Sequence, residues 1–362
     1  MKFVIIDTSI PINTRNCKIE KSIKEFFPDS EVWIFTWKRD NIDFNTPDNY
    51  IVYEAAAAYG NPTEKLKRMY GFGKFARKKL QELLPDIIIA SHWESLLITP
   101  LNLPNKPVLI YENLDIPTGP YPIRRIVQLL ERTKLRGFDL IVHASRFFKE
   151  LYPEPISQIV LENKSKFNFK LDNQPVHNPF VVSYVGTVRY KEILENFVSA
   201  ACSVDGVEVK IFGDGQDFNH IKEFSKRYKN IFFYGAYDFS QIPEIYNQSD
   251  LIWAAYPNKD YNVIYAISNK FYESMACGKP CIYAEKTRLG DFVGRNKMGY
   301  VVDPYSENAI KQLITEVKNN RSDYEACKRN IINNKQSETS WNQDFEKIVE
   351  LIKQKLKEHK NE

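Results

Sequence analysis

The chain has 362 residues, of which 43% are hydrophobic and 27% charged, and its formal net charge is +4. This composition predicts a well-packed protein of two ordinary domains and excludes a disordered chain. The small net charge gives no argument for nucleic acid as a partner. The five cysteines form no C-x-x-C pair, so we expect no zinc site, reduced cysteines and a cytoplasmic protein.

In chain order, short apolar runs alternate with helical stretches. The first half contains six candidate strands, mostly rich in Ile and Val: residues 2–7, 31–37, 49–54, 86–91, 107–112 and 139–145. Helical stretches such as 64–84 and 123–135 lie between several of them. Strands that are apolar on both faces and alternate with helices predict a parallel sheet that is covered on both sides.

The pattern restarts after a polar stretch, 161–180, which we interpret as a linker. Five more candidate strands follow: residues 181–186, 207–213, 230–235, 250–255 and 280–285. We therefore expect an α/β protein with two Rossmann-like, doubly wound domains, residues 1–170 and 171–335, that face a cleft. Residues 336–362 carry a helical apolar stripe, and we expect this C-terminal helix to pack back on the first domain.

Ligands bind open parallel sheets beyond the carboxyl ends of the strands, so the loops there are the first candidates for a site. Gly186 follows a strand, and Arg189 and Lys191 come next before a helix, which suits a phosphate. A surface loop with solvated cations is the alternative. Gly213 and Asp214 lie in a glycine-rich turn after the next strand. This turn either lets the backbone approach a ligand or only reverses the chain, and it lacks the third glycine of a dinucleotide fingerprint.

Gly235 and Tyr237 follow a third strand of the second half, ahead of an Ile-Pro pair that begins a helix. A nucleobase could lie there against backbone groups and the Tyr237 ring. Alone, this pattern would not identify a nucleotide site.

Residues 268–285 read SNKFYESMACGKPCIYAE and predict a helix of about nine residues, capped by Ser268 or Asn269 and ended by a Gly-Lys-Pro sequence. Lys270 and Glu273 are three residues apart and share one face near its N-terminus. A lysine there opposes the helix dipole unless an anion is close, and a glutamate in an apolar setting needs hydrogen-bond donors. A nucleoside diphosphate satisfies both, and a surface ion pair is the alternative.

The stretch SNKFYESMACGKPCI resembles the signature helix, E-x-M-A-x-G-x-P-V-I, of GT-B glycosyltransferases of the kind gathered around the large retaining family 4. Supporting pieces occur in the family's order: FDLIVHAS, VHNPF, YVGTVRYK, IFGDG, and NIFFYG followed by IPEIYNQSDLI. The resemblance covers nearly the whole chain. It implies retaining transfer of a sugar from a UDP- or GDP-linked donor to an acceptor hydroxyl, in surface polysaccharide or glycolipid assembly. It also implies that the first domain binds the acceptor and the second binds the nucleotide sugar.

The resemblance also implies roles for single residues. Glu273 aligns with the glutamate that holds the donor ribose. Arg189 and Lys191 resemble the basic pair that grips the diphosphate, and Lys270 would add to that grip, so these three are the expected catalytic cations. Residues 235–237 fall where the base is held.

In the first domain, His92 and Asp115 end strands and would contact the acceptor or the sugar; a hydrogen-bonded structural role is the alternative. Two positions depart from the family. Tyr265 stands where a second glutamate often touches the donor sugar, and residues 8–13, TSIPIN, replace a glycine-rich loop. No D-x-D sequence occurs, so we expect no metal and no cofactor besides the donor substrate.

The stretch Lys65–Lys79 carries seven cations and no acid, with apolar residues between them. It could lie on anionic lipid, which would place the protein at the inner face of the membrane and suit a lipid-linked acceptor. The alternative is an ordinary basic surface helix that Gly71 and Gly73 break. For the whole chain, three other functions stay open: a nucleotide-sugar isomerase or hydrolase of GT-B fold, an inactive nucleotide-binding partner subunit, and a binding protein of the periplasmic type.

Overall fold

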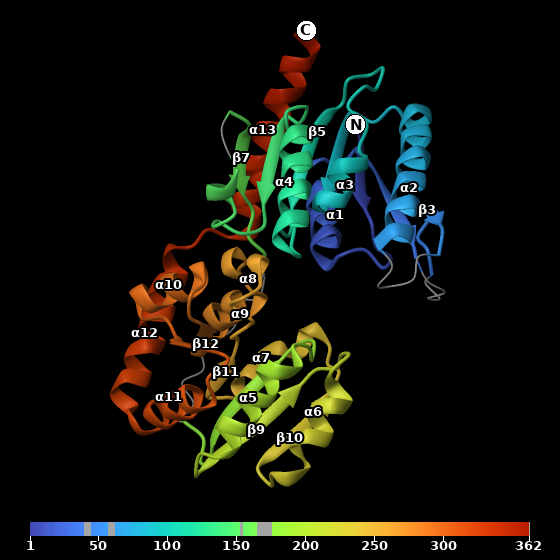
Figure 1. The fold of residues 1–362 in the computed structure, drawn as a ribbon. Helices are drawn as coiled ribbons and strands as arrows, with labels where there is room; N and C mark the ends of the chain where they lie inside the picture. The colour runs from blue at the N-terminus through green and yellow to red at the C-terminus, as the bar shows by residue number, and fades with distance from the viewer. Residues whose placement is uncertain (40–44, 57–61, 153–154, 165–175, 362) are drawn as a thin grey trace. The chain divides into compact units, whose positions relative to one another are not determined.

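The computed structural model describes residues 1–39, 45–56, 62–152, 155–164 and 176–361 (Figure 1). The chain divides into two compact units. The first contains Met1–Asn163 together with Ser340–Glu362, and the second is Lys164–Thr339. The expected boundary between residues 170 and 171 lies outside the described residues.

The first unit holds, within its described residues, one parallel sheet of seven strands in the order β3-β2-β1-β4-β5-β6-β7. The strands are β1 (Lys2–Asp7), β2 (Glu31–Lys38), β3 (Tyr50–Glu54), β4 (Ile87–Ser91), β5 (Val108–Asn113), β6 (Leu140–His143) and β7 (Ser157–Val160). The helices are α1 (Thr14–Phe26), α2 (Pro62–Leu83), α3 (His92–Ile98), α4 (Tyr121–Leu135), the 3-10 turn Lys149–Leu151 and α13 (Trp341–Asn361). The six predicted strands are all present. β7 was not predicted, because its sequence SQIV is short and half polar at the sheet edge.

The second unit repeats this topology with six strands among the described residues, in the order β10-β9-β8-β11-β12-β13. The strands are β8 (Phe180–Val185), β9 (Val207–Phe212), β10 (Ile231–Gly235), β11 (Leu251–Trp253), β12 (Cys281–Ala284) and β13 (Tyr300–Val302). The helices are α5 (Lys191–Cys202), α6 (Phe218–Phe224), α7 (Ile242–Asn247), α8 (Tyr261–Tyr265), α9 (Asn269–Cys277), α10 (Arg288–Asn296), α11 (Glu307–Asn319) and α12 (Arg321–Ser337), with 3-10 turns at Ser225–Arg227 and Phe239–Gln241. Both sheets are therefore doubly wound, as the alternation of strands and helices predicts.

The core of the first unit explains why its strands are apolar on both faces. Phe3 and Ile5 of β1 belong to a buried cluster with α1 and α13, while Val4 and Ile6, on the opposite face, are also fully buried. α3 packs against β1, β4 and β5 and contacts α2 on one side and α4 on the other (Figure 1). The Trp341 indole of α13 donates a hydrogen bond to a serine hydroxyl of α1 at 2.8 Å, so the C-terminal helix is part of the first unit.

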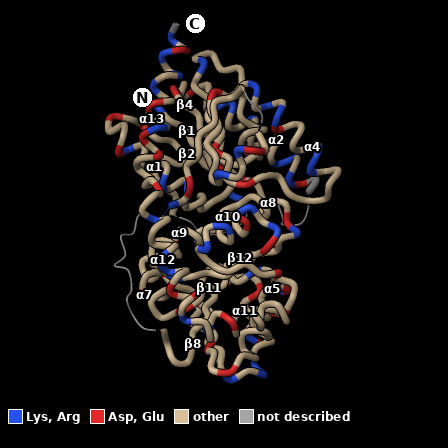
Figure 2. The backbone as a smooth tube through the Cα atoms, turned by 90° about the vertical axis from the view of Figure 1, so that its left-hand side faces the viewer, with Lys and Arg blue, Asp and Glu red and all other residues tan. Residues whose placement is uncertain are grey.

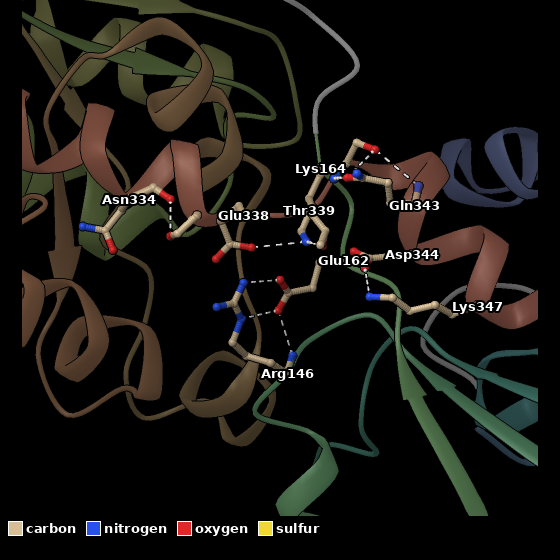
Figure 3. A network of polar contacts seen from close by, with 11 residues as sticks. Arg146, Glu162, Lys164, Asn334, Glu338, Thr339, Gln343, Asp344 and Lys347 are labelled. Carbon is tan, nitrogen blue, oxygen red and sulfur yellow. Dashed lines mark hydrogen bonds and ion pairs between the residues drawn. The ribbon is translucent and has the colours of Figure 1, made fainter.

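The chain passes between the two units twice, at 163–164 and at 339–340. The Lys164 ammonium contacts the Glu338 carboxylate at 3.2 Å and the Thr339 hydroxyl at 2.9 Å (Figure 3). Just before the first passage, Arg146 forms a two-pronged ion pair with the buried Glu162, at 2.8 and 2.5 Å. Lys164 therefore holds the two crossing segments together where the chain changes unit.

Helix α2 runs without interruption through Gly71 and Gly73, so the expectation that these glycines break the helix is wrong. A methyl group at Gly71 would overlap the Tyr53 hydroxyl, and one at Gly73 would come within 3.3 Å of Ile98. These glycines allow close packing of α2 on its neighbours, a contact that the local sequence does not reveal.

Candidate functional site

The carboxyl ends of β8 and β9 meet through a close backbone contact. Gly186 follows β8 with φ +129°, and Gly213 follows β9 with φ +136°. A methyl group at Gly213 would overlap the carbonyl group of Gly186, so the two loops approach this closely only because position 213 is glycine. Asp214 is exposed, and its carboxylate accepts a hydrogen bond from the N–H of Gly215 at 2.7 Å, an arrangement that belongs to a tight turn.

Helix α9 begins at Asn269, and its N-cap residue is Ser268, whose buried hydroxyl has no hydrogen-bond partner among the described residues. Lys270, in the first turn, is only 5% exposed. Its ammonium donates to the Tyr256 hydroxyl at 2.6 Å and lies 5.0 Å from the centroid of the Tyr184 ring. Among the described residues it forms no ion pair. The site thus contains a buried cation whose partners are phenol groups, which leaves its charge available to an anion.

Glu273 lies one turn along α9 and is 8% exposed. Its carboxylate accepts a hydrogen bond from the Tyr246 hydroxyl of α7 at 2.8 Å. Burial raises the pKa of the Glu273 carboxyl, and the Lys270 ammonium and the Tyr246 hydrogen bond oppose this rise only in part. Because Lys270 and Glu273 are both buried, the alternative of an exposed surface pair is wrong.

Arg189 interacts electrostatically with the same two tyrosines, Tyr184 and Tyr256, that Lys270 contacts. Burial raises the pKa of Tyr184 and of Tyr256, and the Arg189 guanidinium lowers both, together with Lys270 in the case of Tyr184. Arg189 is exposed, and its guanidinium carbon lies 4.8 Å from the ring centroid of Tyr190. The structure therefore brings Arg189 and Lys270 to one group of phenols, although they are 81 positions apart in the sequence.

Lys191 is placed differently. It is the first residue of α5, and its backbone N–H donates to the Asp217 carboxylate at 3.1 Å. Its side chain is exposed, and its ammonium makes no hydrogen bond or ion pair with a described residue. The structure does not bring this ammonium into contact with Arg189 or Lys270.

The third strand end contributes Gly235 and Tyr237. Gly235 ends β10 with φ +75°, and a methyl group there would meet no atom within 4 Å, so the backbone faces open space. Tyr237 is half-buried. Burial raises its pKa, and Glu273 and Tyr256 raise it further, so these three side chains belong to one cluster.

Tyr265, at the position of the missing glutamate, ends the short helix α8. Its ring lies edge-on to Tyr261 with centroids 5.4 Å apart, and the Arg288 guanidinium lies 5.7 Å from its centroid.

In the first unit, His92 follows β4 directly and opens α3 with φ +72°. Burial lowers the pKa of its imidazole, and the carboxylates of Glu94, Asp115 and Asp7 act in the opposite sense. His92 and Asp115 are thus close enough to interact, and Asp115 is exposed. The structure places both at the carboxyl edge of the first sheet.

Two buried carboxylates at this edge are satisfied within the first unit. Glu94 accepts hydrogen bonds from Thr8 and Arg39, each at 3.0 Å, and pairs with Lys65. Burial alone would raise the pKa of Glu94, but Lys65, His92 and Arg39 lower it below its ordinary value. Lys65, which the sequence assigns to a lipid-binding stretch, thus neutralises an internal carboxylate.

The other carboxylate is Glu112, at the end of β5. The Arg15 Nε atom donates to it at 2.5 Å, and the Ser91 hydroxyl donates at 3.2 Å. Arg15 and Glu112 are at most 3% exposed, so this is a fully buried ion pair. The Arg15 guanidinium also lies 5.4 Å from the centroid of the Trp341 ring in α13.

Sequence reasoning missed the tyrosines that surround the cations of the second unit. Tyr256 stands three residues beyond the end of β11, at the edge where ligands bind, and this position was an available signal. Tyr184 lies inside β8 and Tyr246 inside α7, and nothing local distinguishes them from core residues.

Residues 165–334 match the family model of glycosyl transferases group 1. This part of the chain belongs to the group 1 glycosyltransferases. The match includes β8, the loop that carries Arg189, and helix α9 with Lys270 and Glu273, so the candidate site lies within the matched region.

Solved structures extend the likeness to the whole chain. Sucrose-phosphate synthase from Thermosynechococcus elongatus is 14% identical over 98% of both chains, with a TM-score of 0.74. HepE of Anabaena, solved in complex with UDP, is 16% identical over 98% of this chain and 100% of that chain, with a TM-score of 0.72. The lipopolysaccharide outer core galactosyltransferase WaaB is 15% identical over 96% and 99%, with a TM-score of 0.63. At these identities the likeness shows the fold, which is GT-B. No curated protein matches by sequence.

In the described part of the chain, no group of three or more His, Cys, Asp and Glu side chains could hold a metal ion. No helix there combines the length and the apolar character needed to cross a membrane.

Proposed function

We propose that the protein transfers a sugar, with retention of configuration, from a nucleoside-diphosphate sugar to an acceptor hydroxyl during assembly of a surface polysaccharide or glycolipid. The observation that carries this proposal is the buried Lys270, unpaired among the described residues and one helical turn from the buried Glu273, inside the region that matches group 1 glycosyltransferases. The HepE structures with UDP and with UDP-glucose support a UDP-linked donor. WaaB, a lipopolysaccharide galactosyltransferase, supports a surface glycan as product.

The donor diphosphate would lie against Lys270 and Arg189, at the N-terminus of α9, where Ser268 and Asn269 offer polar groups. A buried ammonium that forms no ion pair with a described residue, at the N-terminus of a helix, is a strong anion site. The left-handed backbone at Gly186 lets the diphosphate approach the loop closely. Lys191 would add charge from the start of α5.

The nucleoside would lie beside the same helix. Glu273 would accept hydrogen bonds from the ribose hydroxyls, since its carboxylate is held by Tyr246. The open backbone at Gly235 and the ring of Tyr237 would hold the base. The turn at Gly213 and Asp214 would fix the loop that follows β9.

Transfer breaks the bond between the anomeric carbon and the phosphate oxygen, through an oxocarbenium-like transition state. Negative charge grows on the departing diphosphate, and the cations of Lys270, Arg189 and Lys191 stabilise it there without a metal ion. The acceptor hydroxyl oxygen takes the place of the phosphate oxygen on the anomeric carbon, and its proton passes to the oxygen of the departing diphosphate. His92 and Asp115 are the proposed contacts to acceptor or sugar, and Tyr265 is a further candidate contact to the sugar.

The first experiment measures thermal unfolding with UDP, GDP and other nucleotides, followed by nucleotide-sugar turnover with and without a glycolipid acceptor. We expect one diphosphate to raise the melting temperature by several degrees at about 100 times its Kd. Turnover that requires the acceptor supports a transferase. Turnover without acceptor indicates a hydrolase or isomerase. Nucleotide binding without turnover indicates an inactive partner subunit, which Tyr265 in place of a glutamate favours as the second candidate. No stabilisation by any nucleotide contradicts the proposal.

A further inference from the structure

Helix α4 exposes apolar side chains on the face that points away from the sheet. Its buried positions, Glu131 and Leu135, lie four residues apart on one side of the helix. Its exposed large side chains are Tyr121 (60%), Ile123 (57%), Ile126 (60%), Leu129 (66%) and Leu130 (51%). Ile126, Leu129 and Leu130 have the i, i+3, i+4 spacing of a single stripe. An ordinary surface helix carries polar residues at these positions.

The concentration of these residues is particular to α4. Of the thirteen large hydrophobic side chains that are exposed among the described residues, five lie within the ten positions 121–130. Scattered exposed apolar residues need no explanation, but a contiguous apolar face marks a surface that another phase or molecule covers.

The charged residues of α4 indicate what kind of surface covers its apolar face. Cations accompany the apolar face: Arg124, Arg125, Arg132 and Lys134 in the helix and Arg136 directly after it. The one acid of α4, Glu131, is buried and accepts hydrogen bonds from the hydroxyls of Tyr111 and Tyr152, at 2.7 and 2.8 Å. The outer surface of α4 therefore has apolar and positive groups and no negative group.

We propose that α4 lies on an anionic lipid surface, with Ile126, Leu129 and Leu130 in the boundary between headgroups and acyl chains and the arginines against lipid phosphates. Apolar side chains bordered by Arg and Lys are typical of helices that lie in the plane of a membrane interface. A protein partner of opposite charge would have to cover a purely apolar stripe as well, and a second copy would bring like charges together.

Helix α2 carries more cations than α4, but part of its charge is used within the protein. Lys65 pairs with Glu94, Arg68 with Glu64 at 2.7 Å, and Lys79 with Glu82 at 2.8 Å. Among the side chains of α2 that the structure describes, the exposed large apolar ones are Leu66 and Tyr70. Figure 2 marks the lysines and arginines of both helices. Of the two, α4 is the helix whose described residues combine these cations with exposed apolar side chains at i, i+3 and i+4.

The test is co-sedimentation of the full chain with vesicles of equal parts phosphatidylcholine and phosphatidylglycerol, and with vesicles of phosphatidylcholine alone. We expect binding to the anionic vesicles, weakened by salt, and little binding to the neutral ones. Replacing Ile126→Gln and Leu130→Gln together should lower the partition coefficient at least about tenfold, because two buried side chains leave the interface. The matched control in α2, Leu66→Gln with Tyr70→Gln, should stay within about twofold of the wild type.

Arg125→Gln with Arg132→Gln keeps the apolar stripe and should weaken binding to anionic vesicles only. Unchanged melting temperatures would show that the variants are folded, as expected for exposed positions. Equal binding by wild type and the Ile126/Leu130 variant, or no binding by wild type, overturns the proposal. A dimer that this variant dissociates also overturns it and assigns the face to a second copy. The assay contains no nucleotide sugar, so its outcome is independent of the proposed enzymatic function.

Discussion

The two units use the same strand order, but the carboxyl edges of their sheets treat charge differently. In the first unit, the buried carboxylates Glu94 and Glu112 have cationic partners, namely Arg39 and Lys65 for one and Arg15 for the other. In the second unit, the buried cation Lys270 faces phenol groups and has no ion pair among the described residues. At the edge of the first sheet, these two buried carboxylates are paired with cations. At the edge of the second sheet, an anionic ligand would supply the negative partner of Lys270.

Because of this difference, substitutions at the two edges should affect different properties: stability in the first unit and ligand binding in the second. Removing one member of a complete buried pair leaves a charge without compensation, which is costly to the fold. Removing a buried charge that lacks a partner relieves a desolvation cost and takes away only what that charge binds. The four predictions that follow test the contrast, from the largest expected effect to the smallest.

The largest effect is expected at Glu112. Glu112→Gln leaves the Arg15 guanidinium buried without a counterion, and arginine cannot lose its proton to adapt. The free energy of unfolding of the first unit should fall by about 3 kcal/mol, measured by denaturant titration. Arg15→Met combined with Glu112→Leu should recover most of this loss, because both charges are removed. A double variant as unstable as the single one would show that the pair itself is not what stabilises this edge.

Lys270→Met should reduce activity without reducing stability, the opposite of what we expect for Glu112→Gln. We expect kcat/KM for donor turnover to fall about a hundredfold, as when one preorganised electrostatic donor is removed. The melting temperature of the unliganded protein should not fall, since Lys270 forms no ion pair with a described residue and the burial of its charge is costly. The matched control is Lys65→Met, which leaves Glu94 with Arg39 and Thr8 and should change kcat/KM less than about threefold. A Lys270→Met protein that melts well below the wild type would make Lys270 a structural residue.

Glu273→Gln should weaken donor binding and change its dependence on pH. Burial raises the pKa of Glu273, and the ionised form is the one that accepts two ribose hydroxyls. Donor affinity should therefore be greatest above this raised pKa and decline as the pH falls through it, at higher pH than for an ordinary glutamate. At neutral pH the variant should show a KM about tenfold higher with similar kcat, as when one charged hydrogen bond is lost. Its KM should vary less with pH than that of the wild type, and equal pH profiles would exclude Glu273 as the titrating group.

Much of the fold could be predicted because its signals are local. Strands buried on both faces, such as β1 and β4, are continuous Ile and Val runs, and α9 begins and ends where the Ser-Asn and Gly-Lys-Pro sequences indicate. β7 and β13 could not be recognised from the sequence. β7 has four residues, of which two are polar, and β13 has only three residues. The face that α4 turns outward could not be predicted either, because an apolar stripe ordinarily marks the side of a helix that packs on the core, whereas the buried positions of α4 are Glu131 and Leu135.

The site divides in the same way. Lys270 and Glu273 could be singled out because their misfit to an apolar helix is visible within four residues. Their partners Tyr256 and Tyr246 come from the loop after β11 and from α7, and only the folded unit brings these two tyrosines to α9. Contacts of this kind depend on how the whole unit folds. The sequence alone therefore does not show which of two neighbouring cations, such as Arg189 and Lys191, contributes more to binding.

The smallest expected losses of kcat/KM concern Arg189 and Lys191, which the sequence analysis could not distinguish. Arg189 and Lys270 both interact with Tyr184 and Tyr256, whereas the Lys191 ammonium makes no hydrogen bond or ion pair with a described residue. We expect Arg189→Met to lower kcat/KM about tenfold, and Lys191→Met about two- to threefold, since an exposed charge at a helix start is screened by water and salt. Both effects should weaken at high salt, because both side chains are exposed, and the Lys191 effect should be lost first because it is the smaller. Equal losses would mean that the diphosphate lies midway between the two cations and farther from α9 than Lys270 requires.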